Sequence, residues 1–203
     1  MDRSETATRR KILDAALELF ANRGYAGTSV QDIVDAARVT KPVLYYYFRS
    51  KSGLYQALVD TAHDERHRVI CEAARGGRDA ERKLVGIIAA LFKFLHGHRD
   101  LVKIAFATTF AARDELPQEI QYLEKARRNF DVVRDLLRDG QEDGGLSNVF
   151  DAEELALGIW GMMNIYIMAE LVTPGVSLNE KKASDIVRLF LRGAAAKPAR
   201  RPH

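Results

Sequence analysis

Hydroxyl and cationic side chains gather in one short stretch of the sequence, V-T-K-P-V-L-Y-Y-Y-F at Val39 to Phe48. No Asp or Glu occurs from Ala36 to Val59, whereas basic residues recur there: Arg38, Lys41, Arg49 and Lys51. Basic groups without acidic neighbours, mixed with hydroxyl donors, can bind a polyanion such as a nucleic-acid backbone. The chemistry that these residues offer is therefore phosphate binding, provided that the local fold exposes them.

The conformation of this stretch decides which side chains are exposed. By β-propensity alone, V-L-Y-Y-Y-F would be a strand. Thr40, however, is a good N-cap, and Pro42 would be the second residue of the following helix, where its missing N–H is tolerated. A proline in that place is unsuited to a central strand. The flanking residues therefore predict a short helix that begins just after Thr40.

A helical period sorts the aromatic residues of this segment into two sets. At 3.6 residues per turn, Leu44 and Phe48 share a buried face, Tyr45 and Tyr46 point away from it, and Tyr47 flanks it. Phosphate oxygens would suit the exposed hydroxyls, and Val43 would be free to touch a base edge. The alternative is that each tyrosine is a half-buried packing residue on an ordinary surface.

Two further helices are predicted before this one. Apolar residues recur at helical spacing over residues 4–23, and Gly24 follows as a stop signal. The capping-box spacing of Thr28 to Gln31 then predicts a second helix over residues 28–37. Only Arg38 and Val39 remain between this helix and the next, so the connection must be a tight turn.

The segment T-S-V-Q-D-I-V-D-A-A-R-V-T-K-P-V-L-Y-Y-Y-F-R-S-K-S-G-L resembles the helix-turn-helix of the TetR family of bacterial transcription regulators. The resemblance covers about residues 12–58, a quarter of the chain. It implies a double-stranded DNA operator as partner and DNA-binding roles for ten residues: Thr28, Arg38, Thr40, Lys41, Pro42, Val43, Tyr45, Tyr46, Tyr47 and Lys51. Thr28 would cap the second helix and meet a phosphate, and Lys51 would contact a phosphate. Arg38 replaces the family's usual glycine, which implies strain if the turn requires φ > 0.

The remaining sequence predicts only helices. Pro117 is expected to open a seventh helix that ends before Gly140, and Pro174 is expected to stop the eighth. Capping patterns predict helices that start near Asp151 and near Ser177. We expect an all-α fold of about nine helices, with a helix-turn-helix DNA-binding domain over residues 1–52. A ligand-binding and dimerisation domain would follow over residues 53–193, and a frayed basic tail over residues 194–203.

The predicted eighth helix is apolar almost all the way round, from Leu155 to Thr173. Because it carries Asn164 and Glu170, we interpret it as a buried helix of a soluble protein and expect no membrane span. Such a helix must be covered on two sides. We therefore predict a homodimer through the eighth and ninth helices, which would also let two recognition helices meet two half-sites of a palindrome.

Large, adaptable side chains on the fifth to eighth helices could line a pocket for a small apolar or amphipathic ligand. They are Phe92, Phe106, Phe110, Tyr122, Trp160, Met163, Asn164 and Tyr166. The alternative is that each belongs to the ordinary core. His63, His67 and Cys71 recur every four residues, so they could hold a soft metal, or Cys71 could be a redox switch. The charged residues between them favour a solvated helix face over both alternatives.

The single cysteine and an N-terminus without an apolar signal segment favour a reducing, cytoplasmic location. No nucleophile–base pair, metal-ligand spacing or glycine-rich phosphate loop rises above background, so we expect no catalytic residue, no metal and no cofactor. The function that we expect is a ligand-responsive dimeric regulator, and the resemblance implies a repressor that is released by its ligand. The alternatives are an activator, a regulator without a ligand, an enzyme, and a helical adaptor.

Overall fold

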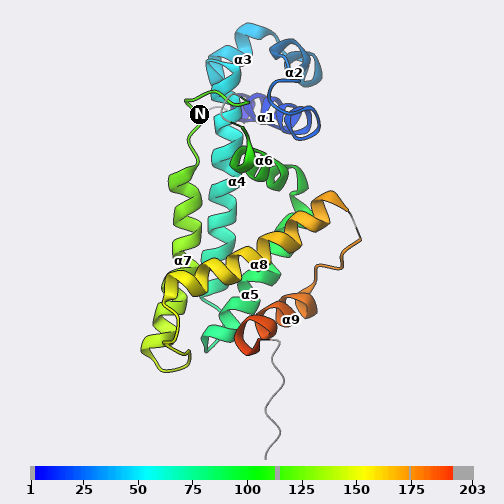
Figure 1. Cartoon of the computed structure of the whole chain (residues 1–203). Helices are drawn as coiled ribbons and strands as arrows, with labels where there is room; N and C mark the ends of the chain where they lie inside the picture. Colours follow the sequence, from blue (N-terminus) through cyan, green and yellow to red (C-terminus); the bar gives the residue numbers. More distant parts are fainter. Residues whose placement is uncertain (1–2, 113–114, 174, 194–203) are drawn as a thin grey trace, which may run out of the picture. The chain divides into compact units, whose positions relative to one another are not determined.

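The computed structural model describes residues 3–112, 115–173 and 175–193, and within them the chain forms nine helices and no strand (Figure 1). The helices are α1 (Arg3–Arg23), α2 (Val30–Ala37), α3 (Lys41–Phe48), α4 (Lys51–Ala74), α5 (Ala80–Gly97), α6 (Arg99–Phe110), α7 (Leu123–Glu142), α8 (Ala152–Val172) and α9 (Glu180–Arg192). The predicted all-α fold is confirmed. The expected stop at Pro174 and the expected tail over residues 194–203 lie outside the described residues.

The chain divides into two compact units. Unit one is made of Met1–Arg68 and Phe94–Asn129, and unit two of Val69–Lys93 and Phe130–His203. Unit one therefore contains more than the 52 residues expected for the DNA-binding domain, because the larger part of α4 and all of α6 belong to it.

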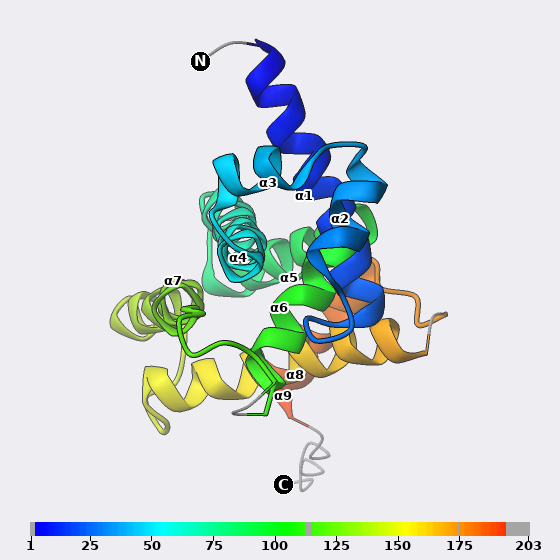
Figure 2. The same ribbon diagram turned by 90° about the horizontal axis from the view of Figure 1, so that it is seen from above.

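Unit one has a continuous apolar core built from five helices. Figures 1 and 2 show α1, α2 and α3 grouped around the N-terminal turns of α4. The core side chains of these helices and of α6 are buried together: Ile12, Ala16, Phe20, Ile33, Val34, Ala37, Leu44, Phe48, Leu54, Leu58 and Ile104. Burial of an apolar side chain of this size stabilises a fold by about 1.5–3 kcal/mol. This shared core fixes the orientation of α3 relative to α1 and α2.

Two predicted helix starts are wrong by one or two residues. The N-cap of α2 is Ser29, whose Oγ accepts a hydrogen bond from Asp32 N, while Asp32 accepts one from Ser29 N at 2.8 Å. Thr28 therefore does not cap α2. The N-cap of α9 is Asn179, whose side chain accepts from Lys182 N at 2.9 Å, and not Ser177. In both cases the capping geometry is present but is displaced along the chain.

The predicted seventh helix begins too early. α7 starts at Leu123 and not at Pro117, and Gly140 lies inside it and not after it. The backbone of Gln121 is bound by the side chain of Gln56 on α4. Gln56 Oε1 accepts from Gln121 N at 2.8 Å, and Gln56 Nε2 donates to Gln121 O at 2.8 Å. These long-range bonds occupy backbone groups that a helix from Pro117 would have used.

In unit two, α8 presents two different faces. One face is buried and includes Ala156, Ile159, Met163 and Ile167. The other is an exposed apolar stripe of residues that lie within about 80° of one another around the helix axis. The stripe is made of Leu157, Gly161, Ile165, Met168 and Val172.

α8 is also long and apolar enough to cross a membrane, the single such helix among the described residues. Length and composition are weak support for a span, because a helix between two protein surfaces has the same composition.

Asp151 and Glu154 form a capping box at the start of α8, as the sequence predicts, and Glu170 lies near the end of this helix.

Candidate nucleic-acid interface

Helix α3 exposes the side chains that the helical period predicts. Leu44 is fully buried and Phe48 is 6% exposed, whereas Tyr45 is 44% and Tyr46 72% exposed. Tyr47 is half-buried, and its ring meets that of Tyr46 edge-on with centroids 5.0 Å apart. The segment is a helix and not a strand, so two hydroxyl-bearing rings face away from the core.

The N-terminus of α3 is exposed together with these rings. Thr40 is the N-cap, with extended backbone angles, and its side chain makes no capping hydrogen bond. Thr40, Lys41 and Pro42 are exposed, and Val43 is half-buried. We refer to Thr40, Lys41, Pro42, Tyr45 and Tyr46 as the α3 surface. Its hydroxyls and its single charge, a positive one, point to an anionic partner.

The turn before α3 has the strained geometry that an arginine in place of the family's glycine implies. Arg38 has φ 54° and ψ 49°, the left-handed region that favours glycine. Its N–H donates to Asp35 O at 3.2 Å, and Val39 N donates to Val34 O at 3.0 Å. These two bonds form a Schellman motif that ends α2. The left-handed conformation costs a non-glycine residue roughly 1–2 kcal/mol, and the side chain of Arg38 is exposed.

The expected phosphate contact of Thr28 needs correction. Thr28 is 1% exposed, and its hydroxyl donates to Gly24 O at 2.9 Å. The hydroxyl thus closes the loop between α1 and α2 and does not reach solvent. We exclude Thr28 from the candidate interface for this reason.

Lys51 also makes its contacts inside unit one. Its Nζ donates to Tyr25 O at 2.9 Å and to Thr28 O at 3.0 Å, and it lies 4.0 Å from the centroid of the Tyr25 ring. Burial lowers the pKa of this ammonium. The lysine therefore ties the start of α4 to the loop between α1 and α2, in place of the phosphate contact that the resemblance implies.

Sequence reasoning missed the aromatic support beneath this loop. Tyr25 packs against Phe20 and Tyr55 with ring centroids 5.8 and 5.2 Å apart, and the Tyr55 hydroxyl lies 3.0 Å from that of Thr108 on α6. The guanidinium of Arg9 on α1 lies 5.1 Å from the centroid of the Phe48 ring. The aromatic residues were visible in the sequence, but their partners are distant along the chain.

The eight residues expected to line a ligand pocket are divided between the two units. Phe106, Phe110 and Tyr122 belong to unit one, where the rings of Phe106 and Phe110 stack with centroids 6.2 Å apart and Phe110 is 72% exposed. The other five belong to unit two: Phe92, Trp160, Met163, Asn164 and Tyr166.

Within unit two, these residues have different surroundings. Phe92 and Met163 are buried in the core, and Trp160 packs edge-on against Phe130. Tyr166 faces the ammonium of Lys182 at 5.8 Å, and Asn164 is half-buried. A ligand pocket that joins all eight residues stays a prediction.

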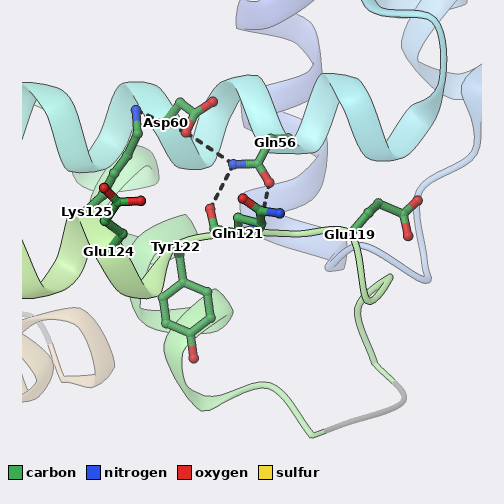
Figure 3. A pocket seen from close by; sticks show the side chains of 7 residues that line it. All are labelled: Gln56, Asp60, Glu119, Gln121, Tyr122, Glu124 and Lys125. Atoms are coloured by element: carbon green, nitrogen blue, oxygen red, sulfur yellow. Dashed lines mark hydrogen bonds and ion pairs between the residues drawn. The ribbon is translucent and has the colours of Figure 1, made fainter.

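Tyr122 lines an open pocket of about 270 Å³ in unit one (Figure 3). The other lining residues are Gln56, Asp60, Glu119, Gln121, Glu124 and Lys125. Lys125 Nζ lies 3.1 Å from Asp60 and 2.7 Å from Asp64, so it joins the start of α7 to α4. In Figure 3 the Tyr122 ring projects away from Gln56.

The stripe of His63, His67 and Cys71 is not a solvated helix face. His63 is 3% exposed, and the half-buried His67 bonds through Nδ1 to Asn129 Oδ1 at 3.0 Å. Cys71 is half-buried. Among the described residues, no group of three or more His, Cys, Asp or Glu side chains is placed to hold a metal ion.

Comparison with known proteins decides what the helices of unit one represent. Residues 12–58 match the family model described as bacterial regulatory proteins, tetR family. These residues form the helix-turn-helix segment of the TetR family. The matched residues run from the core of α1 to α4 and include the whole α3 surface, so this surface belongs to the helix-turn-helix of the family.

Curated relatives extend the similarity over most of the chain. The HTH-type transcriptional regulator YvkB of Bacillus subtilis (strain 168) is 26% identical over 191 residues, 93% of this chain and 98% of that protein. Two proteins of Mycolicibacterium smegmatis are also similar. The transcriptional activator FasR is 29% identical and covers 74% of this chain and 66% of its own length. The transcriptional repressor KstR2 is 28% identical and covers 74% and 73%.

Solved structures share the fold of this chain. PfmR from Thermus thermophilus superposes with a TM-score of 0.75 at 22% identity, over 92% of this chain and 96% of that one. FadR from Bacillus subtilis, solved in complex with stearoyl-CoA, superposes with a TM-score of 0.76 at 21% identity, over 92% and 99%.

Proposed function

We propose that this protein is a dimeric transcriptional regulator that binds a palindromic DNA operator through α3. One observation carries the proposal. In a helix-turn-helix of the TetR family, Tyr45 and Tyr46 are exposed beside Thr40 and Lys41, while Leu44 and Phe48 anchor the helix in the core. The hydroxyls and Lys41 contact the sugar-phosphate backbone, and Val43 reaches a base edge. Such a protein acts in the cytoplasm, where the DNA is.

The DNA-binding residues have two kinds of role in this proposal. Arg38 and the α3 surface contact DNA directly, together with Val43 and the half-buried Tyr47. Lys51 acts as a positioning residue, because its ammonium is bound to the loop between α1 and α2. This loop leads directly into α2, so its bonds to Lys51 hold the start of α2 in place relative to α4.

The apolar stripe on α8 supports a second copy of the chain as partner. Exposed apolar residues in one continuous row favour a protein interface. Leu189 on α9 is 46% exposed, and α8 contacts α9 within unit two, so both helices can contribute. A two-fold dimer would place two copies of α3 on two half-sites of DNA.

We further propose that the protein is a repressor released by a small amphipathic molecule. Support comes from the repressor KstR2 among its relatives and from FadR, a structural neighbour that holds stearoyl-CoA. The relative FasR is an activator, so the sign of regulation must be measured. A promoter reporter in cells with and without the gene decides it, because loss of a repressor raises expression.

Footprinting of the DNA beside the protein's own gene, combined with a salt titration, tests DNA binding. We expect protection of two half-sites about one helical turn, or a multiple of it, apart. The affinity should fall steeply with salt, because each neutralised phosphate contributes about −0.9 to the slope of log K against log[salt]. Val43→Ala should change sequence preference and leave this slope intact. An affinity that depends neither on the DNA sequence nor on the salt concentration would exclude the proposal.

A further inference from the structure

His63 on α4 has a buried side chain whose polar atoms are unsatisfied. The residue is 3% exposed, and both of its ring nitrogens are buried. Neither nitrogen has a hydrogen-bond partner in the part of the chain that the structure describes. Buried polar atoms are nearly always hydrogen-bonded in native proteins, and an unmade bond destabilises the fold. An imidazole in this situation can form the missing bond with a buried water molecule or with a bound ligand.

We propose that His63 is the polar anchor of an effector site in unit one, and that it binds the carboxylate of a small organic acid. This inference rests on the proposed function, because the effector is the one that would control DNA binding. A neutral imidazole carries one N–H donor, which a carboxylate oxygen can accept.

Charges of both signs surround His63, and the buried guanidinium of Arg66 is the positive group that a carboxylate ligand would face. Burial lowers its pKa to about 4, helped by the positive charges of Arg66 and Lys125 and opposed by the carboxylates of Asp64 and Asp60. Lys125 is already balanced by its ion pairs with these two carboxylates. Arg66 lies one turn further along α4, and burial lowers its pKa to about 10. A carboxylate beside His63 would stabilise the charged form of this guanidinium.

Tyr122 connects His63 with the open pocket. Its ring stacks on the imidazole with centroids 6.3 Å apart and an interplanar angle of 20°. The same residue lines the pocket of about 270 Å³, and Figure 3 shows it at the start of α7. Tyr122 is half-buried and its carbonyl oxygen accepts from Ala126 N at 2.8 Å, so its ring can change rotamer while this first helical bond of α7 is kept. A planar acid could then take the place of the ring against His63.

The position of Tyr122 gives such a ligand a route to the DNA-binding helices. The neighbouring Gln121 is bound through its backbone to Gln56 on α4. A ligand that displaces Tyr122 therefore acts on a segment that is hydrogen-bonded to α4. Differential binding to the displaced form would shift the protein away from its DNA-binding conformation.

The experiment compares two probes that differ only in the head group, benzoate and benzyl alcohol. The imidazole resonances of the full-length protein are recorded by NMR during titration with each probe. We expect benzoate to shift the His63 resonances and to raise the His63 pKa, and benzyl alcohol to leave both unchanged. His67, which bonds to Asn129, is the internal control and should not respond. The site is disproved if benzoate produces no shift, or if benzyl alcohol produces an equal one.

A pair of variants supplies a second readout in case either probe binds weakly. His63→Leu removes the unsatisfied nitrogens and should raise the Tm by roughly 4 °C while it abolishes the rise in Tm that benzoate causes. The matched His67→Leu breaks a hydrogen bond and should lower the Tm but keep the benzoate effect. A lower Tm together with a preserved benzoate effect in His63→Leu would overturn the inference. None of these readouts uses DNA, so a failure here is distinct from a failure of the proposed operator binding.

Discussion

The ammonium of Lys51 lies 4.0 Å from the centroid of the Tyr25 ring and donates to the carbonyl oxygen of the same residue at 2.9 Å. One lysine at the start of α4 thus binds the loop between α1 and α2 through both a cation–π contact and hydrogen bonds. A lysine held in this way orients the DNA-binding helices, and it does not need to touch DNA to affect operator affinity.

Replacement of Lys51 should therefore weaken DNA binding without changing its salt dependence. We expect Lys51→Met to destabilise the fold by about 2 kcal/mol, because hydrogen bonds from a charged donor are lost. Operator affinity should fall about tenfold, equivalent to about 1.4 kcal/mol. The slope of log K against log[salt], measured by fluorescence anisotropy, should stay at the wild-type value.

Lys41→Met provides the matched control, because Lys41 is exposed on α3. This variant should reduce the magnitude of the salt slope by about 0.9, the value for one lost phosphate contact, with little effect on stability. An equal loss of slope in Lys51→Met would show that Lys51 leaves the loop and binds a phosphate.

We expect Arg38 to lower the free energy of unfolding and to raise the affinity for the operator. Its φ of 54° is accessible to glycine without strain, so Arg38→Gly should raise the free energy of unfolding by about 1 kcal/mol in chemical denaturation. The same variant should bind the operator more weakly and with a smaller salt slope, because a positive charge is lost. Arg38→Lys, which keeps the charge and the strain, should change neither quantity much. Unchanged DNA binding in Arg38→Gly would remove Arg38 from the interface.

The local features of the helix-turn-helix could be predicted from the sequence. The faces of α3 follow from its helical period, and its start follows from Thr40 and Pro42, all of which are encoded within a short stretch of chain. The positive φ at Arg38 could be anticipated only as a condition, because the resemblance places the family's usual glycine at this position. Local rules suffice here because each feature depends on near neighbours along the chain.

Features that depend on distant partners could not be predicted in this way. The start of α7 is delayed by the bonds between Gln56 and Gln121, which are 65 residues apart. The residue type of Lys51 suggested a contact with a DNA phosphate. The direction of its side chain is instead set by the hydrogen bond to the carbonyl oxygen of Tyr25. His63 lies among charged neighbours and resembles a surface residue, yet its side chain is buried and its ring stacks on that of Tyr122.

The apolar stripe of α8 predicts how association can be disrupted. Ile165 is 53% exposed in the single chain and lies in the middle of the stripe. Ile165→Asp would bury a carboxylate at a dimer interface, so we expect the dimer to weaken by roughly 3 kcal/mol, about two orders of magnitude in Kd. Sedimentation velocity over a range of concentrations measures this change. Leu123→Asp is the control, because Leu123 is 71% exposed but lies outside the stripe, on α7. A stable dimer in Ile165→Asp would place the interface elsewhere.

The depressed pKa of His63 predicts how stability depends on pH. In the unfolded chain this imidazole titrates near 6.5, whereas in the folded protein its pKa is about 4. Between these values the unfolded state binds a proton that the folded state excludes, so stability must fall as the pH falls. The expected slope is about 1.4 kcal/mol per pH unit, or roughly 3 kcal/mol over the whole window.

Urea denaturation at several pH values from about 7 to about 4 measures this slope, and His63→Leu should flatten it. The carboxylate of Asp64 does not produce the same effect. Burial raises the pKa of Asp64, but the hydrogen bonds from Lys125 and Arg128 lower it by more, so the net pKa is below that of an ordinary aspartate. The contribution of Asp64 to stability is therefore lost only at pH values below the ordinary pKa of an aspartate. His67→Leu should keep the wild-type slope. If His63→Leu kept that slope as well, the imidazole would have to accept a proton inside the fold, and a carboxylate ligand would then meet a charged anchor and not a neutral one.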